Sequence, residues 1–240
     1  MLSFIIPAHN EEALIGATID SISACATKSG RPFEIIVSSD ASTDRTSEIA
    51  RQKGARVVEV NNRQIAATRN CGAREAKGDI FIFIDADTQL TDAALSDALA
   101  ALDSGAVGGG GQVKLDGYVP FAARVFVYIF TIVYFGLKLA AGCFIFARRD
   151  TFEKAGGFNE QFYAGEEIHL SKALKRQGKF VIVRGAVISS GRKARMFTFF
   201  QMIKLFVRLG WQGKRSMQKR EGLEFWYDGR RESGTANERH

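Results

Sequence analysis

Ile80-Phe81-Ile82-Phe83-Ile84-Asp85-Ala86-Asp87 is the stretch that decides the fold, because it joins five apolar residues to two carboxylates. An apolar run without polar alternation is typical of a strand buried on both faces, as in a parallel sheet covered by helices on each side. Such sheets bind their ligands at the carboxyl ends of the strands. We therefore expect Asp85 and Asp87 to lie where an α/β protein holds its ligand.

The two carboxylates allow two interpretations. Side chains alternate along an extended chain, so Asp85 and Asp87 are expected to point the same way. Two like charges held close together are costly unless a cation lies beside them, and oxygen ligands suit Mg²⁺ or Mn²⁺. The other interpretation is a turn at the end of the strand that carries two solvated acids. The motif alone does not separate the two.

Strands and helices are predicted to alternate through the first hundred residues. Strands are expected at 2–6, 33–37, 56–60 and 80–84. Helices are expected after Asn10 as a cap, after Ser42 or Thr43 as a cap and ending at Gly54, over 64–77, and over 91–102. This β-α-β-α order predicts an α/β fold with a mostly parallel, Rossmann-like central sheet flanked by helices.

The second half of the chain is less regular. A turn is expected at 108–111, with strands at 112–115, 143–147, 180–183 and 186–188. A helix is expected over 168–174, ending at Gly178. Residues 232–240 are polar and are expected to be disordered.

Composition limits the classes of protein that the chain can belong to. Its 240 residues, 46% of them hydrophobic, suffice for one domain or for a domain with a tail. The net charge of +7 favours anionic partners such as nucleotide phosphates, nucleic acid or an acidic membrane surface, although a basic surface also serves solubility alone. Cys25, Cys71 and Cys143 form no metal or disulfide pattern, and Cys25 and Cys143 are expected in the core.

The cysteine pattern and the first residues bear on location. Unpaired cysteines point to a reducing compartment. The apolar start at residues 1–6 is too short for a secretory signal and has no basic residues before it. A cytoplasmic location is the resulting expectation.

Two apolar segments each leave two interpretations open. Residues 125–137 are almost wholly apolar but are too short to span a bilayer, which needs about 20 residues. They form either a buried helix or a helix at a lipid interface. Residues 196–211 mix aromatic and basic side chains, as in helices that lie on membranes, or as in a helix packed on the sheet with its charges in solvent.

Several short motifs occur in a particular order. Pro7-Ala8-His9-Asn10-Glu11-Glu12 follows the first strand, Ser38-Ser39-Asp40-Ala41-Ser42-Thr43-Asp44 closes the second, and Ala67-Thr68-Arg69-Asn70-Cys71-Gly72 precedes the strand that ends in Asp85-Ala86-Asp87. Gly156-Gly157-Phe158-Asn159-Glu160 and Gly165-Glu166-Glu167 come later. In this order the set resembles the family 2 glycosyltransferases, which have the GT-A fold. The resemblance covers about residues 2–195.

The resemblance implies a domain organisation. It implies one GT-A domain over residues 1–213, with a nucleotide-binding half at 1–105 and an acceptor and catalytic half at 106–213. Residues 214–240 remain as a polar tail.

The resemblance also implies a set of residues that bind the nucleotide. Pro7, Asn10 and Glu11 lie where the family's first loop meets the nucleoside. Asp40 matches the acid that recognises the base, since a carboxylate can accept the N–H of a uracil or guanine edge. Arg69 matches a basic residue near the phosphates, which suit guanidinium geometry.

For the metal and for catalysis the resemblance points to four acids. Asp87 matches the direct ligand of Mn²⁺ or Mg²⁺, and Asp85 lies nearer the ribose or sugar while sharing the metal motif. Glu167 matches the catalytic base, and Glu166 could share or take this role because the family usually has Glu-Asp here. His169, two residues on, is either a third metal ligand or a polar residue on a helix face.

Other departures from the family's pattern concern the nucleotide loop and the last strand. Ser39 replaces an acid, so one nucleotide contact could be lost, and Ala41 replaces a glycine, which constrains the turn. Arg192, Lys193 and Arg195 either clamp a diphosphate or an anionic acceptor, or form a solvated basic run. The Gln-x-x-Arg-Trp signature of processive members is absent, which favours addition of a single sugar.

The implied function is inverting transfer of one sugar from a UDP- or GDP-sugar to an acceptor hydroxyl or phosphate, with a divalent metal. The apolar segment at 119–141 lies where the family shapes its acceptor site, so a lipid-linked acceptor and peripheral attachment to the cytoplasmic membrane face are expected. A nucleotidyltransferase and a weakly catalytic nucleotide-sugar-binding scaffold are the rivals. A Rossmann dehydrogenase is disfavoured, because no G-x-G-x-x-G follows the first strand.

Overall fold

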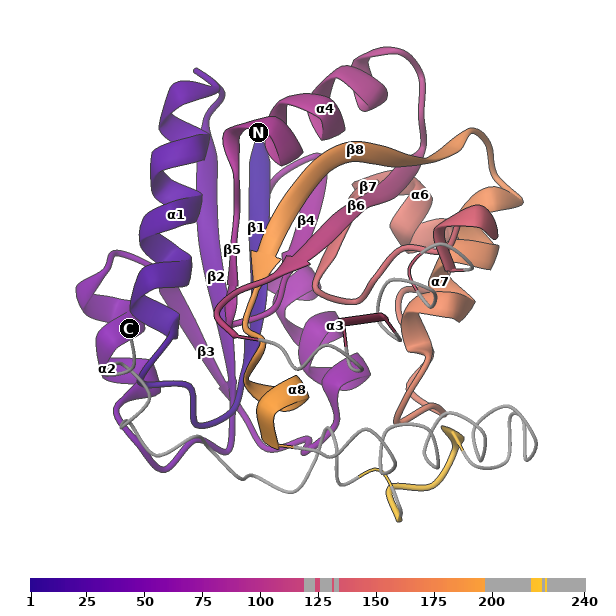
Figure 1. The fold of residues 1–240 in the computed structure, drawn as a ribbon. Helices are drawn as coiled ribbons and strands as arrows, with labels where there is room; N and C mark the ends of the chain where they lie inside the picture. Colours follow the sequence, from indigo (N-terminus) through magenta and orange to yellow (C-terminus); the bar gives the residue numbers. More distant parts are fainter. Residues whose placement is uncertain (119–123, 126–130, 132–133, 197–216, 222, 224–240) are drawn as a thin grey trace.

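The structure is a computed structural model and describes residues 1–118, 124–125, 131, 134–196, 217–221 and 223. The strands are β1 (Leu2–Ala8), β2 (Phe33–Asp40), β3 (Arg56–Val60), β4 (Ile80–Ile84), β5 (Thr88–Gln89), β6 (Gly108–Leu115), β7 (Phe144–Arg148) and β8 (Phe180–Ser189). The helices are α1 (Ile15–Lys28), α2 (Thr46–Gln52), α3 (Ile65–Glu75), α4 (Asp92–Asp103), α6 (Arg149–Lys154), α7 (Glu166–Lys175) and α8 (Arg192–Met196). Figure 1 shows their arrangement.

One sheet joins all of these strands in the order β3-β2-β1-β4-β7-β6-β8-β5. The half formed by β3, β2, β1 and β4 is wholly parallel, and β6 also runs parallel to β8. Strand β7 is antiparallel to both of its neighbours, and β5 is antiparallel to β8. The prediction of an α/β fold with a mostly parallel central sheet flanked by helices is confirmed.

Helices cover both faces of the sheet, and the alternation along β4 shows why its run is apolar throughout. Ile82 and Ile84 pack into a cluster with α1 and α4, whereas Phe81 and Phe83 pack into a second cluster with α3, α6 and α7. All four side chains are at most 1% exposed. A strand buried on both faces needs an apolar residue at every position.

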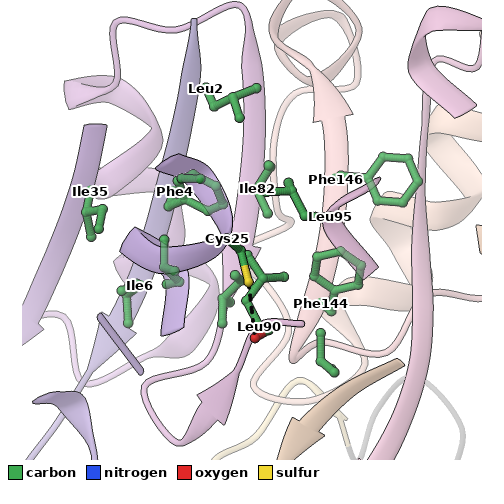
Figure 2. Packing of buried hydrophobic residues seen from close by; sticks show 14 of the residues in the cluster. Leu2, Phe4, Ile6, Cys25, Ile35, Ile82, Leu90, Leu95, Phe144 and Phe146 are labelled. Atoms are coloured by element: carbon green, nitrogen blue, oxygen red, sulfur yellow. Dashed lines mark hydrogen bonds between the residues drawn. The ribbon is translucent and has the colours of Figure 1, made fainter. Parts of the chain in front are cut away.

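The first of these clusters is drawn in Figure 2, where α1 lies across the strands. The residues that sequence periodicity assigned to the inner face of α1, namely Ile15, Ile19, Ile22 and Ala26, are fully buried. Cys25 is buried as predicted and donates its thiol to the carbonyl oxygen of Leu90 at 3.6 Å. Burial raises the pKa of this thiol to about 12, so Cys25 behaves as a core residue.

Residues 108–111 were expected to form a turn, and that prediction is wrong, because they are the first half of β6. A side chain at Gly109 would overlap the carbonyl oxygen of Val181 and the ring of Phe146. The glycines therefore allow β6 to lie close to both neighbouring strands. The strands expected at 180–183 and 186–188 form one strand, β8, whose pairing with β6 shifts register between Gly111 and Gln112.

Two predicted helix caps are also wrong. Helix α1 begins at Ile15 without a side-chain cap, and Asn10 has a positive φ of 51° instead. The Asn10 Oδ1 atom accepts a hydrogen bond from the Thr43 N–H at 2.8 Å, which ties the loop after β1 to the loop after β2. Helix α2 begins at Thr46, whose N–H donates to Asp44, so neither Ser42 nor Thr43 caps it.

The two apolar segments lie largely outside the described residues. Of the first, Leu137 is 62% exposed and Val125 is 41% exposed, so a fully buried helix does not account for these two positions. Of the second, only Met196 is described, and residues 232–240 are not described at all. Leu223 lies in the segment that the sequence assigns to a polar tail, yet it is 1% exposed. Within the described residues, no helix combines the length and apolarity that a membrane crossing requires.

Candidate active site

A cavity of about 550 Å³ lies at the carboxyl ends of β1, β2 and β4. It is bounded by the loops that follow these strands, by α3, by the start of α7 and by Arg192 at the start of α8. Eight of the nine residues that the sequence assigned to a site line it: Pro7, Glu11, Asp40, Arg69, Asp85, Asp87, Glu166 and Glu167. Asn10 is not among the lining residues.

Asp85 and Asp87 lie just beyond β4 and both face the cavity. The side chain of Asp87 is only 13% exposed and that of Asp85 is 35% exposed. Each has an arginine beside it: Arg69 Nη2 lies 2.7 Å from Asp85 Oδ1, and Arg192 Nη2 lies 3.1 Å from Asp87 Oδ2. A turn with two solvated acids is therefore not what the structure shows.

These two carboxylates fit part of a metal shell. Among the residues that the structure describes, no group of three or more His, Cys, Asp or Glu side chains is arranged to hold a metal ion. Mg²⁺ commonly takes only one or two carboxylates from the protein and completes its shell with water and substrate phosphates. The donor set of Asp85 and Asp87 in an open cavity matches that manner of binding.

Arg69 holds the centre of the site. Its side chain is 3% exposed, and its Nη1 and Nη2 atoms each lie 2.7 Å from a carboxylate oxygen, of Glu166 and Asp85 respectively. The guanidinium also lies over the ring of Phe158, 5.1 Å from its centroid. Burial works to lower the pKa of Arg69, but the charges of Asp85 and Glu166 keep it above its usual value. Arg69 thus bridges two acids, whereas the resemblance implied a contact with phosphate.

Glu166 and Glu167 open α7 and have different surroundings. Glu166 is buried in its ion pair with Arg69. Glu167 is half-buried and accepts a hydrogen bond from the Tyr134 hydroxyl, with 2.9 Å between the oxygen atoms. Burial, and then the neighbouring charge of Glu166, raise the pKa of Glu167 to about 7. A carboxyl group with such a pKa can exchange a proton near neutral pH.

Arg192 also belongs to the site. Its guanidinium donates to both carboxylate oxygens of Glu11, at 2.7 and 2.5 Å, in addition to its contact with Asp87. It is 8% exposed, so the prediction of a solvated run is wrong for this residue. Arg195 instead binds Asp116, with 3.3 Å from its Nη1 atom to the Asp116 carbonyl oxygen, and it does not line the cavity.

Three positions singled out in the sequence have structural surroundings of their own. Asp40 is 6% exposed, and its carboxylate accepts hydrogen bonds from the loop that precedes α3. Ala41 has a positive φ of 51°, which explains why a glycine is usual at this turn. His169 stacks on the ring of Phe162, with 3.9 Å between ring centroids, and does not line the cavity.

Some residues of the site escaped prediction. Tyr134 lies in an apolar run, where its hydroxyl is a polar group that needs a partner, and that need was the available signal. Arg63 and Arg220 line the cavity from loops without a recognisable pattern. His9 was quoted in a motif but given no role; it lines the cavity, and its Nδ1 atom lies 2.6 Å from the Asp40 carbonyl oxygen.

Comparison with known proteins is consistent with this geometry. The family described as "Glycosyl transferase family 2" matches residues 3–155. The 4,4'-diaponeurosporenoate glycosyltransferase of Staphylococcus haemolyticus is 40% identical over 98 residues, which are 38% of this chain and 25% of the relative. The undecaprenyl-phosphate 4-deoxy-4-formamido-L-arabinose transferase of Pseudomonas aeruginosa is 36% identical over 97 residues, which are 37% of this chain and 28% of the relative. The chain therefore spans about a quarter of the length of these curated relatives.

Solved structures extend the comparison to most of the chain. The glucosyl-3-phosphoglycerate synthase of Mycobacterium tuberculosis, crystallised with Mn²⁺, uridine diphosphate and glucosyl-3-phosphoglycerate, is 25% identical to this chain. It superimposes with a TM-score of 0.53, covering 78% of this chain and 70% of the synthase.

Proposed function

The chain belongs to glycosyl transferase family 2 and has a fold of the GT-A type, and on this premise we propose that it transfers one sugar from a UDP- or GDP-sugar to an acceptor. The observation that carries the proposal is the arrangement across one cavity. Asp85 and Asp87, with two arginines beside them, form one part of its lining, and Glu167, with a pKa near neutrality, forms another. Transfer of a sugar needs both parts, one for the leaving diphosphate and one for the acceptor.

We propose that the diphosphate binds beside Asp85 and Asp87. Asp87, with Asp85, would hold Mn²⁺ or Mg²⁺, and the bound ion would supply positive charge to the diphosphate as it leaves. Arg192 lies next to Asp87, so its guanidinium is placed to donate to phosphate oxygens when the nucleotide is present. Arg69 keeps Asp85 in position through their ion pair. Pro7 and Asp40 line the part of the cavity proposed for the nucleoside.

We assign the general base to Glu167. Tyr134 binds its Oε1 atom, which leaves Oε2 to accept the proton of the acceptor hydroxyl. Such a base typically contributes about 10²–10⁴-fold to the rate. Glu166 is committed to Arg69 and is the poorer candidate. With one base and no second nucleophile proposed, the acceptor oxygen displaces the diphosphate directly, and the anomeric carbon inverts.

A lipid-linked acceptor is the second part of the proposal. The name of one relative contains undecaprenyl phosphate, an apolar chain that carries a phosphate. In this chain, exposed Val125 and Leu137 lie beside the basic residues Arg124 and Lys138, a combination that suits the interface of an anionic membrane. Peripheral attachment to the membrane would bring such an acceptor to the cavity. Flotation with anionic liposomes at low and high salt tests it, and absence of binding at low salt contradicts it.

The activity is tested with purified protein and a panel of UDP- and GDP-sugars, with Mn²⁺ or with EDTA. Release of the nucleoside diphosphate should require the metal ion and should increase when undecaprenyl phosphate is supplied in detergent. Glu167→Gln should retain donor binding while losing transfer. Asp103→Ala serves as the matched control, because Asp103 is an exposed acid on α4 that pairs with Arg31. Donor binding without turnover by the unaltered protein would identify a binding scaffold and contradict the proposal.

A further inference from the structure

The carboxylate of Asp40 is fully engaged by its own chain. Its Oδ1 atom accepts the N–H groups of Asn62 and Arg63, each at 2.8 Å. Its Oδ2 atom accepts the N–H of Gln64 at 3.1 Å and the hydroxyl of Thr68 at 2.8 Å. A carboxylate offers about four lone-pair positions, so these four donors occupy all of them. No position remains for the N–H group of a nucleobase.

The same four bonds shape the loop before α3. Three consecutive N–H groups converge on one buried carboxylate, and this convergence requires an unusual backbone. Arg63 has a positive φ of 49°, a conformation that a residue with a side chain rarely adopts. The bonds to Asp40 hold it there, and the side chain of Arg63 consequently lines the cavity while remaining exposed.

Arg63 differs from the two central arginines of the cavity. The guanidinium groups of Arg69 and Arg192 are bound to carboxylates. Within the described part of the chain, the Arg63 guanidinium makes no hydrogen bond or ion pair. Its donors are therefore available to a ligand, without first breaking a bond to the protein.

The position of Arg63 matches the base end of a nucleotide. The β2 strand, which carries Asp40, lies two strands from β4, which leads to Asp85 and Asp87. Two strand spacings amount to about 9–10 Å. With the diphosphate beside Asp85 and Asp87, and the sugar toward Glu167, the nucleoside extends toward Asp40 and Arg63.

We propose that Arg63 reads the base of the donor nucleotide and that Asp40 is the positioning residue that presents it. The guanidinium N–H groups donate to carbonyl oxygens on the base edge, such as those of uracil or guanine. This inference rests on the proposed function, because it takes the ligand to be a nucleoside diphosphate. It replaces direct base recognition by Asp40, which the resemblance implied.

Calorimetric binding of UDP, GDP and inorganic pyrophosphate, each with Mn²⁺, tests the assignment. Arg63→Ala should weaken binding of the preferred nucleotide about ten- to hundredfold, as expected for loss of a hydrogen bond from a charged group. Binding of pyrophosphate, which has no base, should change less than about twofold on the same reasoning. Arg63→Lys should restore part of the affinity, and Arg74→Ala, an exposed arginine on α3 outside the cavity, should have no effect.

A double-mutant cycle separates the roles of Asp40 and Arg63. Asp40→Asn weakens nucleotide binding under either assignment. If Asp40 acts through Arg63, adding Asp40→Asn to Arg63→Ala should cause little further loss of affinity for the nucleotide. Additive losses, or full affinity in Arg63→Ala, would overturn the inference. If Asp40→Asn does not fold, Thr68→Val frees one lone pair of Asp40 and takes its place in the cycle.

The outcomes also distinguish this inference from the proposed function. Failure of the unaltered protein to bind any of the three ligands with Mn²⁺ would remove both. Tight nucleotide binding that is insensitive to Arg63 would remove only the assignment of Arg63 and leave the glycosyltransferase proposal in place.

Discussion

Replacing Tyr134 with phenylalanine should move the acid limb of the pH–activity profile to higher pH. The Tyr134 hydroxyl donates to Glu167 Oε1 at 2.9 Å and so favours the ionised carboxylate. Burial and the charge of Glu166 raise the pKa of Glu167 to about 7 in spite of this hydrogen bond. Without the hydroxyl, the opposing influences remain and the pKa rises further. The base is then protonated over a wider range of pH and cannot accept a proton from the acceptor.

The size of the effect follows from the strength of the bond. A hydrogen bond to a charged group contributes about 1.5–3 kcal/mol, and 1.36 kcal/mol corresponds to one pKa unit. The pKa of Glu167 should therefore rise by about one to two units. At pH 7 roughly half of the unaltered enzyme has an ionised base, compared with roughly 1–10% of the variant, so activity should fall about 5- to 50-fold. Above pH 9 most of this loss should disappear.

The assay is kcat/KM for transfer between pH 5.5 and 9.5, since this ratio reports the ionisation of the free enzyme. Tyr118→Phe is the control, because Tyr118 is 73% exposed and does not line the cavity. A Tyr134→Phe profile that is lowered equally at every pH would mean that the hydroxyl has only a structural role. A limb that stays in place or moves to lower pH would refute the assignment of Glu167 as the base.

Two further predictions concern stability. Ala41→Gly should raise the unfolding free energy by about 1 kcal/mol, because Ala41 has a positive φ of 51°, whereas the control Ala24→Gly, at an exposed position of α1, should lower it by about as much; urea unfolding measures both, and equal signs would contradict the argument. Glu167→Gln should stabilise the protein by about 1–3 kcal/mol at pH 8 and by nothing at pH 4, since a carboxyl whose pKa is raised from 4.5 to about 7 destabilises the fold as it ionises between these values. Thermal unfolding at the two pH values measures this, and a variant less stable at pH 8 would show that Glu167 is not a destabilising charge.

The parallel half of the sheet could be predicted from the sequence because its signals are local. The apolar run of β4, the stripe of α1 and the acids after β4 each follow from periodicity within a few residues. The same holds for the cluster of acids around the cavity, since parallel strands bring their carboxyl ends to one edge. Local pattern and tertiary position agree in this half.

Prediction failed where the cause lies in a distant partner. The glycines of β6 are typical of a turn, and only the close approach of Val181 and Phe146 explains them in a strand. Arg69 was assigned to phosphate, but Glu166, 97 residues away, takes one of its nitrogens. The tie between Arg192 and Glu11 spans 181 residues. Such pairs are set by the assembled fold, and a basic residue alone gives no sign of which acid it meets.

The central claim is that Asp87 and a nucleoside diphosphate together bind a divalent cation, and titration with Mn²⁺ monitored by electron paramagnetic resonance tests it most directly. Unaltered protein should bind about one Mn²⁺ tightly when UDP or GDP is present and bind it much more weakly alone, since the two carboxylates supply only part of the shell. Asp87→Ala should lose the nucleotide-dependent binding, and Asp103→Ala should keep it. Tight Mn²⁺ binding that needs neither nucleotide nor Asp87 would contradict the account.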